Sequence, residues 1–433
     1  MLNLSDAKTP ARKAGTPFKK GGISSRKKKP ARSLDYEKII RRMGRLKPPY
    51  MNFTLLCAVI CIALFGLAMV YSASWYNSRI YHGTKYHYFT SQLIGFVLGI
   101  VLMAAAYIVD YRIYKKWAVA FYIIAAVLLI LVFVPGIGIT RLGSSRWIGV
   151  GGFSMQPSEI AKFAFIIFAA AIATRTSPVA PKGASTPYFK GDSQKVFSLK
   201  KTLLIASAGL AYCAFILLEP NLSITLCMGM TMFIMLFLCG ARLKHLAVIA
   251  APALVALPVM LVAEPYRVRR LLAFIDPWAR PKDEGFQLIQ SLFGLGNGGL
   301  FGVGYGNSTQ KHMFLPFAES DFIFSIIGEE FGFIGSVLFL AVLGLIVTQI
   351  FRVGIRCPDR FGKYICYGIA TVIFVQSAVN LAVVTGSIPP TGVPLPFISF
   401  GGTSLAVCMA AVGVVLNIDK RTKILDNKHY NGI

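Results

Sequence analysis

The sequence predicts an all-α integral membrane protein with ten transmembrane helices. Of its 433 residues, 55% are hydrophobic, and the mean hydropathy of +0.62 is too high for a soluble domain. The apolar residues form runs of about 17–25 residues, the length of a helix that crosses a hydrocarbon core ~30 Å thick. We expect spans near 51–73, 89–109, 117–135, 157–174, 203–219, 222–240, 246–265, 323–350, 364–385 and 402–418.

Basic residues indicate how these spans are oriented. Lys and Arg are dense before the first span and recur in alternate loops, which places both termini in the cytoplasm. Examples are Arg112, Lys115, Lys116, Arg242, Lys244, Arg352, Arg356 and Lys420. We expect a basic, disordered cytoplasmic tail over 1–50, the ten-helix membrane domain over 51–418 and a cytoplasmic C-terminal tail over 419–433.

The formal net charge of +27 does not indicate nucleic-acid binding. The positive charge is scattered among loops and is not gathered in one folded domain. Part of it orients the spans, and part lies in a tail next to an anionic lipid leaflet. We therefore expect the membrane, and not a nucleic acid, as the partner of these charges.

A long polar stretch over 266–322 separates the seventh and eighth spans. We expect a large extracytoplasmic loop that carries the site. Arg267, Arg270 and Lys311 keep positive charge on this side against the usual distribution, which suggests an anionic ligand. Asp321 lies where the loop re-enters the bilayer. Because a charge at membrane depth costs about 2.5–3.5 kcal/mol, such an acid usually faces a cavity and has a function.

The glycine-rich segment 296–308 precedes Lys311 in the same loop. It lacks the Gly-Lys-Ser/Thr ending and the preceding strand of a nucleotide-binding loop, so a nucleotide site is not expected. Two interpretations stay open. The segment is either a tight turn packed at the membrane surface or a loop that approaches a lipid diphosphate, with Lys311 supplying a charge.

Glu159 and Lys162 lie three residues apart at the start of the fourth span, on one helix face. They form either a structural ion pair between helices or a pair of substrate contacts, and both roles are compatible. Arg146 lies in the outer loop before this span, next to Trp147. It is either an interfacial anchor or a contact to a diphosphate.

Two further segments lie near the end of the loop. Glu329 and Glu330 follow Asp321 on the eighth span, and we expect at least one of them to be a buried acid satisfied by a neighbouring helix. The segment 385–404 contains several prolines and Ser399, so it cannot be regular helix. We expect it to form a re-entrant wall of the same cavity.

Together these pieces resemble the SEDS family of cell-wall polymerases, which includes FtsW, RodA and SpoVE. The matching pieces are Arg146-Trp147-Ile148, Gln156-Pro157-Ser158-Glu159 with Lys162, Asp276-Pro277-Trp278, Gly302 to Ser308 with Gln310-Lys311, Asp321 to Phe324 with Gly328-Glu329-Glu330, and Pro394 to Gly402. Their order and separation over 146–402 make the resemblance specific, although any single piece would be weak.

The resemblance implies a peptidoglycan glycosyltransferase in the bacterial cytoplasmic (inner) membrane. It would polymerise lipid II into glycan strands at the outer face by inverting transfer, and we expect the division role. Asp321 corresponds to the essential acid of the family. The implied partners are lipid II, undecaprenyl-diphosphate-linked glycan, a class B penicillin-binding protein transpeptidase and other division or elongation proteins.

For the chemistry, an acceptor hydroxyl needs a base and a leaving diphosphate needs positive charge. We predict Asp321 as the catalytic base and Arg146, Glu159, Lys162, Arg267, Arg270, Lys311 and Ser399 as substrate-binding residues. No cofactor is certain, with a divalent cation (Mg²⁺ or Mn²⁺) as a candidate and its ligands unknown. Two rival functions stay open: a flippase that transports the lipid-linked precursor, and a non-catalytic scaffold of the division machinery.

The sequence departs from the usual family pattern at four positions. Phe317, Glu319 and Ser320 stand where Glu, His and Thr are common, and Asn221 stands where an acid follows Pro220. We expect these changes to affect details of acceptor binding more than the reaction.

Overall fold

The computed structural model describes residues 51–141, 144–150, 153–175, 199–262 and 264–430. The predicted tail over 1–50 lies outside the described residues. The helices are α2 Phe53–His82, α3 His87–Ile108, α4 Arg112–Lys116, α5 Ala118–Leu131, α6 Pro157–Thr174, α7 Leu199–Leu218, α8 Leu222–Leu238, α9 Leu243–Val262, α10 Pro265–Ile275, the 3₁₀ turn η1 Pro277–Ala279, α11 Phe286–Asn297, α12 Ile323–Arg356, α13 Arg360–Val384 and α14 Gly402–Tyr430.

Long apolar helices dominate this part of the chain. Within the described residues, seven helices are long and apolar enough to cross a membrane, namely α2, α3, α6, α7, α12, α13 and α14. Three shorter apolar helical segments, α5, α8 and Leu243–Ala256 of α9, lie where the remaining predicted spans were expected. The helical membrane fold is therefore confirmed, while the count of ten spans stays a prediction.

Two boundaries differ from the sequence prediction. α14 continues to Tyr430, past the expected boundary at 418, and this extension contains an i,i+4 ion pair between Asp419 and Lys423 at 2.7 Å. The interval between α9 and α12 is not a simple loop, since it contains α10, η1 and α11. The amphipathic sequence of α10 is too polar for a hydropathy scan to detect.

The prediction of an all-α fold was incomplete. A three-stranded antiparallel sheet of β1 Gly138–Arg141, β2 Ser144–Val150 and β3 Phe153–Met155 lies between α5 and α6. A search for long apolar runs cannot detect strands of seven residues or fewer. The sheet matters for function because Arg146 lies on its central strand.

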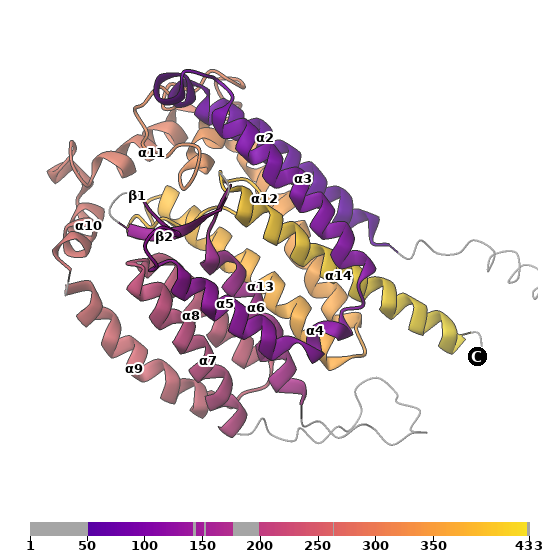
Figure 1. The fold of residues 1–433 in the computed structure, drawn as a ribbon. Helices are drawn as coiled ribbons and strands as arrows, with labels where there is room; N and C mark the ends of the chain where they lie inside the picture. Colours follow the sequence, from indigo (N-terminus) through magenta and orange to yellow (C-terminus); the bar gives the residue numbers. More distant parts are fainter. Residues whose placement is uncertain (1–50, 142–143, 151–152, 176–198, 263, 431–433) are drawn as a thin grey trace, which may run out of the picture. The chain divides into compact units, whose positions relative to one another are not determined.

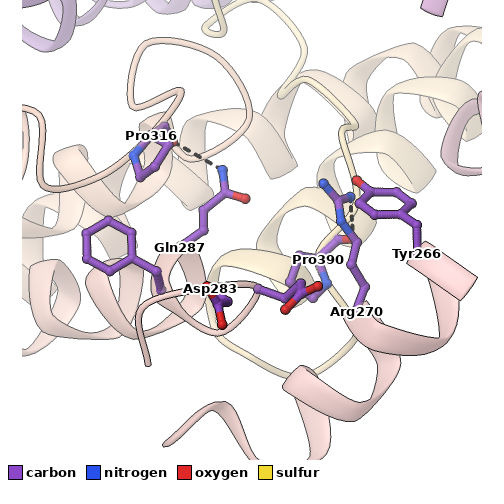
Figure 2. A pocket seen from close by; sticks show the side chains of 8 residues that line it. Tyr266, Arg270, Asp283, Gln287, Pro316 and Pro390 are labelled. Atoms are coloured by element: carbon purple, nitrogen blue, oxygen red, sulfur yellow. Dashed lines mark hydrogen bonds between the residues drawn. The ribbon is translucent and has the colours of Figure 1, made fainter. Parts of the chain in front are cut away.

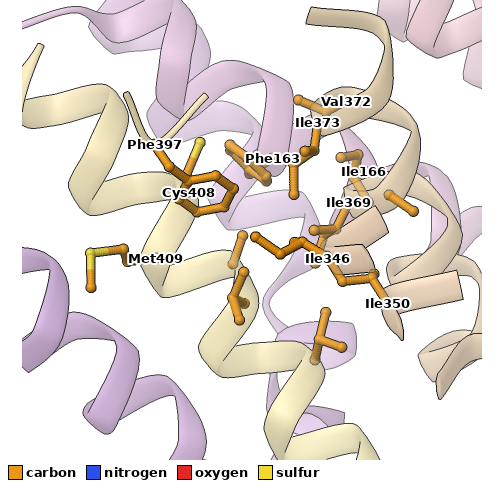
Figure 3. Close-up of a cluster of buried hydrophobic side chains, with 14 of the residues drawn as sticks. Phe163, Ile166, Ile346, Ile350, Ile369, Val372, Ile373, Phe397, Cys408 and Met409 are labelled. Atoms are coloured by element: carbon orange, nitrogen blue, oxygen red, sulfur yellow. The ribbon is translucent and has the colours of Figure 1, made fainter. Parts of the chain in front are cut away.

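The core lies between α6, α12, α13 and α14. Figure 3 shows Ile166, Ile346, Ile369 and Cys408 from these four helices pointing toward a common centre, and all are buried. α3 packs closely on α14, where a methyl group on Gly95 would lie 2.3 Å from Cα of Gly402. This buried apolar core fixes the helices that carry the site.

The connections gather at two ends of these helices. Figure 1 shows the sheet, α10 and α11 at one end, and α4 with the C-terminal end of α14 at the other. At the second end, Arg421 of α14 lies 3.4 Å from Asp110, directly before α4, and Nζ of Lys115 lies 5.8 Å from the centre of the Phe361 ring. Lys115, one of the basic residues that indicate the orientation of the spans, therefore lies at the end away from the sheet and α10.

A break in α12 accommodates the glycine-rich loop. Gly332 has φ 67° and ψ −166°, and a side chain there would collide with the backbone N of Gly302 at 2.4 Å. The amides of Val303 and Gly304 donate to the carbonyls of Glu329 and Glu330 at 2.9 and 3.0 Å. These amides are already used, so the structure supports the tightly packed turn and not a loop open to a diphosphate.

Candidate active site

Asp321 lies in the turn directly before α12, and the residue as a whole is partly exposed. Nδ2 of Asn380, on α13, donates to the Asp321 carbonyl at 2.7 Å and to the Val393 carbonyl at 2.8 Å. The hydroxyl of Ser320 donates to Oδ1 of Asp321 at 2.9 Å. The backbone of the acid is thus fixed from a neighbouring helix.

The proline-rich segment packs against this turn, as predicted. The Ser399 hydroxyl donates to the Ser320 carbonyl at 2.7 Å and accepts from the Leu395 amide at 2.7 Å. A methyl group added to Gly392 would lie 3.1 Å from Oδ2 of Asp321. Ser399 was expected to touch substrate, but the structure uses its hydroxyl to hold the wall of the site.

Two guanidinium groups lie near the Asp321 carboxylate. Burial of the carboxyl group raises its pKa to about 6, although the Ser320 hydrogen bond and the charges of Arg270 and Arg146 act in the opposite direction. Desolvation therefore outweighs the two cations. A carboxylate with this pKa is ionised at neutral pH and remains basic enough to accept a proton.

Arg146 reaches this cluster from β2. Its Nε donates to the Glu219 carbonyl at 3.2 Å and its Nη2 donates to the Pro220 carbonyl at 2.6 Å. Both acceptors lie in the turn between α7 and α8. Asn221 caps α8 in the same turn, since its Oδ1 accepts from the Ile224 amide at 3.3 Å. Asn and Asp both serve as N-caps, so this departure from the family pattern preserves the turn.

Arg270 connects Asp321 to an open pocket of about 390 Å³ (Figure 2). Its Nη1 donates to the Pro390 carbonyl at 3.4 Å, and its guanidinium lies 4.5 Å from the centre of the Tyr266 ring. Asp321 itself does not line this pocket. The lining residues are Tyr266, Arg270, Asp283, Glu284, Phe286, Gln287, Pro316 and Pro390. Arg267 lies three residues before Arg270 on α10, which puts both on one helix face.

Lys311 does not reach this cluster. Its Nζ lies 3.1 Å from Oε1 of Glu330 and 3.3 Å from the Ser72 hydroxyl, and the side chains of Lys311 and Glu330 are both fully buried. The predicted diphosphate contact therefore does not fit this structure. The charge of Lys311 is neutralised by Glu330 inside the protein. The prediction that a neighbouring helix satisfies a glutamate is confirmed, because Ser72 of α2 donates to Glu330 at 2.6 Å.

Glu159 and Lys162 form a closed ion pair. Nζ of Lys162 lies 2.7 Å from Oε1 of Glu159, and both side chains are fully buried. Ser404 of α14 donates to Oε2 of the same glutamate at 2.8 Å. The geometry matches the structural alternative, because the pair joins α6 to α14 and exposes no charge.

Several residues that shape the site were not singled out from the sequence. Asn380 and Gln92 lie inside long apolar helices, and a polar amide in such a helix was the available signal. Nε2 of Gln92 donates to the Ser399 carbonyl at 3.3 Å, and its Oε1 accepts from the Gly401 amide at 2.9 Å. Glu219 was also missed, although it is an acid at the edge of a span.

Glu319, which stands where the family commonly has histidine, has a structural role. Oε2 of Glu319 accepts from Asn77 of α2 at 3.5 Å, and its carbonyl accepts from the Phe400 amide at 2.9 Å. The glutamate thus joins α2 and the proline-rich segment two residues before Asp321. Burial raises its pKa.

The acids near Asp321 do not fit a metal centre held by the protein. Glu319 is engaged with Asn77, and the charges that act on the pKa of Asp321 are those of Arg270 and Arg146. In the described part of the chain, no three His, Cys, Asp or Glu residues are placed to share an ion. The Mg²⁺ or Mn²⁺ candidate stays a prediction.

Comparisons with known proteins agree with the resemblance. A family model described as "Cell cycle protein" (FtsW, RodA, SpoVE) matches residues 52–424. Stage V sporulation protein E of Bacillus subtilis is 36% identical over 373 residues, which cover 85% of this chain and 97% of that protein. A protein named probable peptidoglycan glycosyltransferase FtsW, from Geobacter sp. (strain M18), is 38% identical over 374 residues, covering 86% and 98%.

Solved structures extend the similarity to three dimensions. A chain from a study titled "Structural coordination of polymerization and crosslinking by a peptidoglycan synthase complex" matches with a TM-score of 0.67 at 26% identity, covering 86% of this chain and 98% of that one. The rod shape determining protein RodA of Thermus thermophilus matches with a TM-score of 0.60 at 25% identity, covering 85% and 96%. The chain therefore belongs to the FtsW/RodA/SpoVE (SEDS) family of cell-cycle proteins.

Proposed function

We propose that this protein is a peptidoglycan glycosyltransferase that polymerises lipid II at the outer face of the bacterial cytoplasmic membrane. The observation that carries the proposal is the partly exposed Asp321, on which the charges of Arg146 and Arg270 act, with Arg270 also lining an open pocket. The names of the relatives and the family membership support the same activity. The similarity to proteins named FtsW favours the division role.

Asp321 would act as the general base. Its carboxylate would accept the proton from the 4-hydroxyl of the acceptor GlcNAc while that oxygen attacks the anomeric carbon of the donor. One C–O bond forms as the bond to the diphosphate breaks, and the electron pair leaves with the diphosphate. A base of this kind contributes roughly 10²–10⁴-fold to the rate.

Arg146 and Arg270 would stabilise the charge on the leaving diphosphate. Both guanidinium groups keep N–H donors beyond those used in their hydrogen bonds to backbone carbonyls. A planar guanidinium suits phosphate oxygens because it can donate two parallel hydrogen bonds. An α-linked donor that gives a β-linked product inverts the anomeric centre, so no second nucleophilic carboxylate is needed.

The proposed topology follows from this chemistry. All ten apolar helices would cross the membrane, both termini would be cytoplasmic, and the sheet, α10, α11 and Asp321 would lie on the outer side. The positions of the basic residues support this orientation. We propose a class B penicillin-binding protein as the partner, because a similar solved chain belongs to a study of a peptidoglycan synthase complex.

Reconstitution tests the proposal. The purified protein, with and without a cognate transpeptidase, is placed in vesicles with lipid II, and glycan product and lipid translocation are measured together. We expect glycan strands from the wild type, and none from Asp321→Asn although that variant inserts and folds normally. Translocation without polymer would favour the flippase. Full polymerisation by Asp321→Asn would remove the base role from this residue.

A further inference from the structure

Glu219 lies at the end of α7 with a carboxylate that has no partner. Its side chain is 0% exposed, and neither Oε1 nor Oε2 has a hydrogen-bond partner among the residues that the structure describes. An ionised carboxylate buried in this way is costly unless it is paired or protonated. This acid is therefore either protonated and neutral, or ionised and in need of a cationic partner.

The nearest cation is already bound elsewhere. Arg146 lies close enough to Glu219 for electrostatic attraction, yet its guanidinium donates to the backbone carbonyls of Glu219 and Pro220 and not to the carboxylate. The same guanidinium interacts with Asp321, Arg270 and Tyr266. Arg146 thus lies between a buried acid and the site.

The protonation of Glu219 follows from its burial. Desolvation raises its pKa to about 8, with the charge of Arg146 acting in the opposite direction. At neutral pH the acid is mostly neutral and does not compete for the guanidinium. Above that pKa it becomes a buried anion next to an arginine, and an ion pair between them would relieve its desolvation.

We propose that Glu219 is a positioning residue for Arg146: the neutral acid leaves the guanidinium in the observed position, from which it acts on Asp321 and the diphosphate, and the ionised acid draws it away. The inference rests on the proposed glycosyl transfer. It identifies the proton of the Glu219 carboxyl group as the one that controls the position of the Arg146 guanidinium. The charged and titratable groups around this unit are Arg146 on β2, Tyr266 and Arg270 on α10, and Asp321 before α12.

The consequence is a loss of activity at alkaline pH that does not come from Asp321. When Arg146 turns toward an ionised Glu219, the diphosphate loses one of its two stabilising cations, so the rate of bond breaking falls. The acid side of the pH profile still reports Asp321. The two acids therefore control opposite sides of one profile.

The test compares the polymerisation rate of the full-length protein in vesicles at pH 7 and pH 9. In the wild type, pH 9 is one unit above the Glu219 pKa of about 8. About nine-tenths of Glu219 is then ionised, so we expect the polymerisation rate to fall roughly tenfold. In Glu219→Gln the side chain cannot ionise, and we expect the ratio of the two rates to stay near one. An equal fall in both proteins would overturn the inference.

A second variant keeps the test decisive if Glu219→Gln folds poorly. Arg146→Gln removes the cation through which Glu219 acts, so its residual activity should also lose the alkaline fall. A tenfold fall that persists in Arg146→Gln contradicts the inference. A wild type that makes no polymer at any pH would instead contradict the proposed function, so the two failures can be distinguished.

Discussion

Two groups of acidic and basic residues were both predicted as site residues from the sequence, and they differ in structure. Glu159 and Lys162 are one acid and one base at 2.7 Å, both fully buried, with Ser404 occupying the other carboxylate oxygen. Asp321 is partly exposed, and its two arginines donate to backbone carbonyls while acting on it only through their charge.

The difference separates a structural ion pair from a site. The Glu159–Lys162 pair uses its charges and joins two helices, so it has nothing left for a ligand. The group around Asp321 has more positive than negative charge and keeps free donors, which is what an anionic substrate requires. The buried Lys311–Glu330 pair belongs with the first kind.

Breaking the closed pair should give the largest effect. Lys162→Met leaves a buried, unpaired Glu159, and losing one partner of a buried ion pair costs about 3–5 kcal/mol of stability. We expect a strongly lowered unfolding midpoint in detergent, measured by thermal denaturation. The isosteric change Glu159→Gln should also lower the midpoint, because it leaves the buried Lys162 without a counter-charge.

The double variant Glu159→Gln/Lys162→Met decides between the two roles of this pair. If the pair is structural, removing both charges should restore much of the stability, and the folded protein should polymerise lipid II. A stable double variant without activity would instead show that these residues contact substrate.

Weakening the open group should leave the fold intact and reduce the rate. Arg270→Gln removes one of two cations near the leaving diphosphate, and losing one such donor typically costs about 10²–10³-fold in rate. Asp321 would also lose a charge that lowers its pKa. The activity of the variant should therefore begin to fall at a higher pH on the acid side.

The neighbouring residue provides the control for this prediction. Arg269 pairs with Glu284 at 2.8 Å at the surface, and such pairs contribute little. Arg269→Gln should therefore keep nearly all activity in the same kinetic assay. Equal losses in both variants would mean that α10 acts through its fold or overall charge and not through Arg270.

The sequence was sufficient to place the helices but not to sort these charges. Apolar length located α2, α6 and α13, and proline spacing identified the irregular wall at 385–404. The sequence could not show that Lys311 turns inward to Glu330 while Arg270 turns toward Asp321, because both are basic residues of the same polar stretch. The direction in which each side chain turns depends on packing between segments far apart in the chain. The position of Arg146, on a short strand, depends on the same kind of packing.

The acid side of the pH profile should report Asp321. Its pKa is raised to about 6, and a general base works only when ionised, so activity should be retained above this pH and lost below it. At pH 5, one unit lower, we expect roughly a tenfold lower rate than on the plateau. A pH series of the initial polymerisation rate measures this, and an acid side that stays flat to pH 4.5 would contradict the assignment.

The smallest change should come from one methyl group beside the base. In Gly392→Ala the new Cβ lies 3.1 Å from Oδ2 of Asp321, so the carboxylate must shift by a few tenths of an ångström. Because rates depend steeply on the alignment of reacting groups, we expect about a two- to fivefold lower rate with little change in lipid II affinity. Gly344→Ala is the matched control, since nothing lies within 4 Å of its added carbon. A rate loss confined to Gly392→Ala would show that the reaction depends on the position of the Asp321 carboxylate, whereas equal losses in both variants would contradict this prediction.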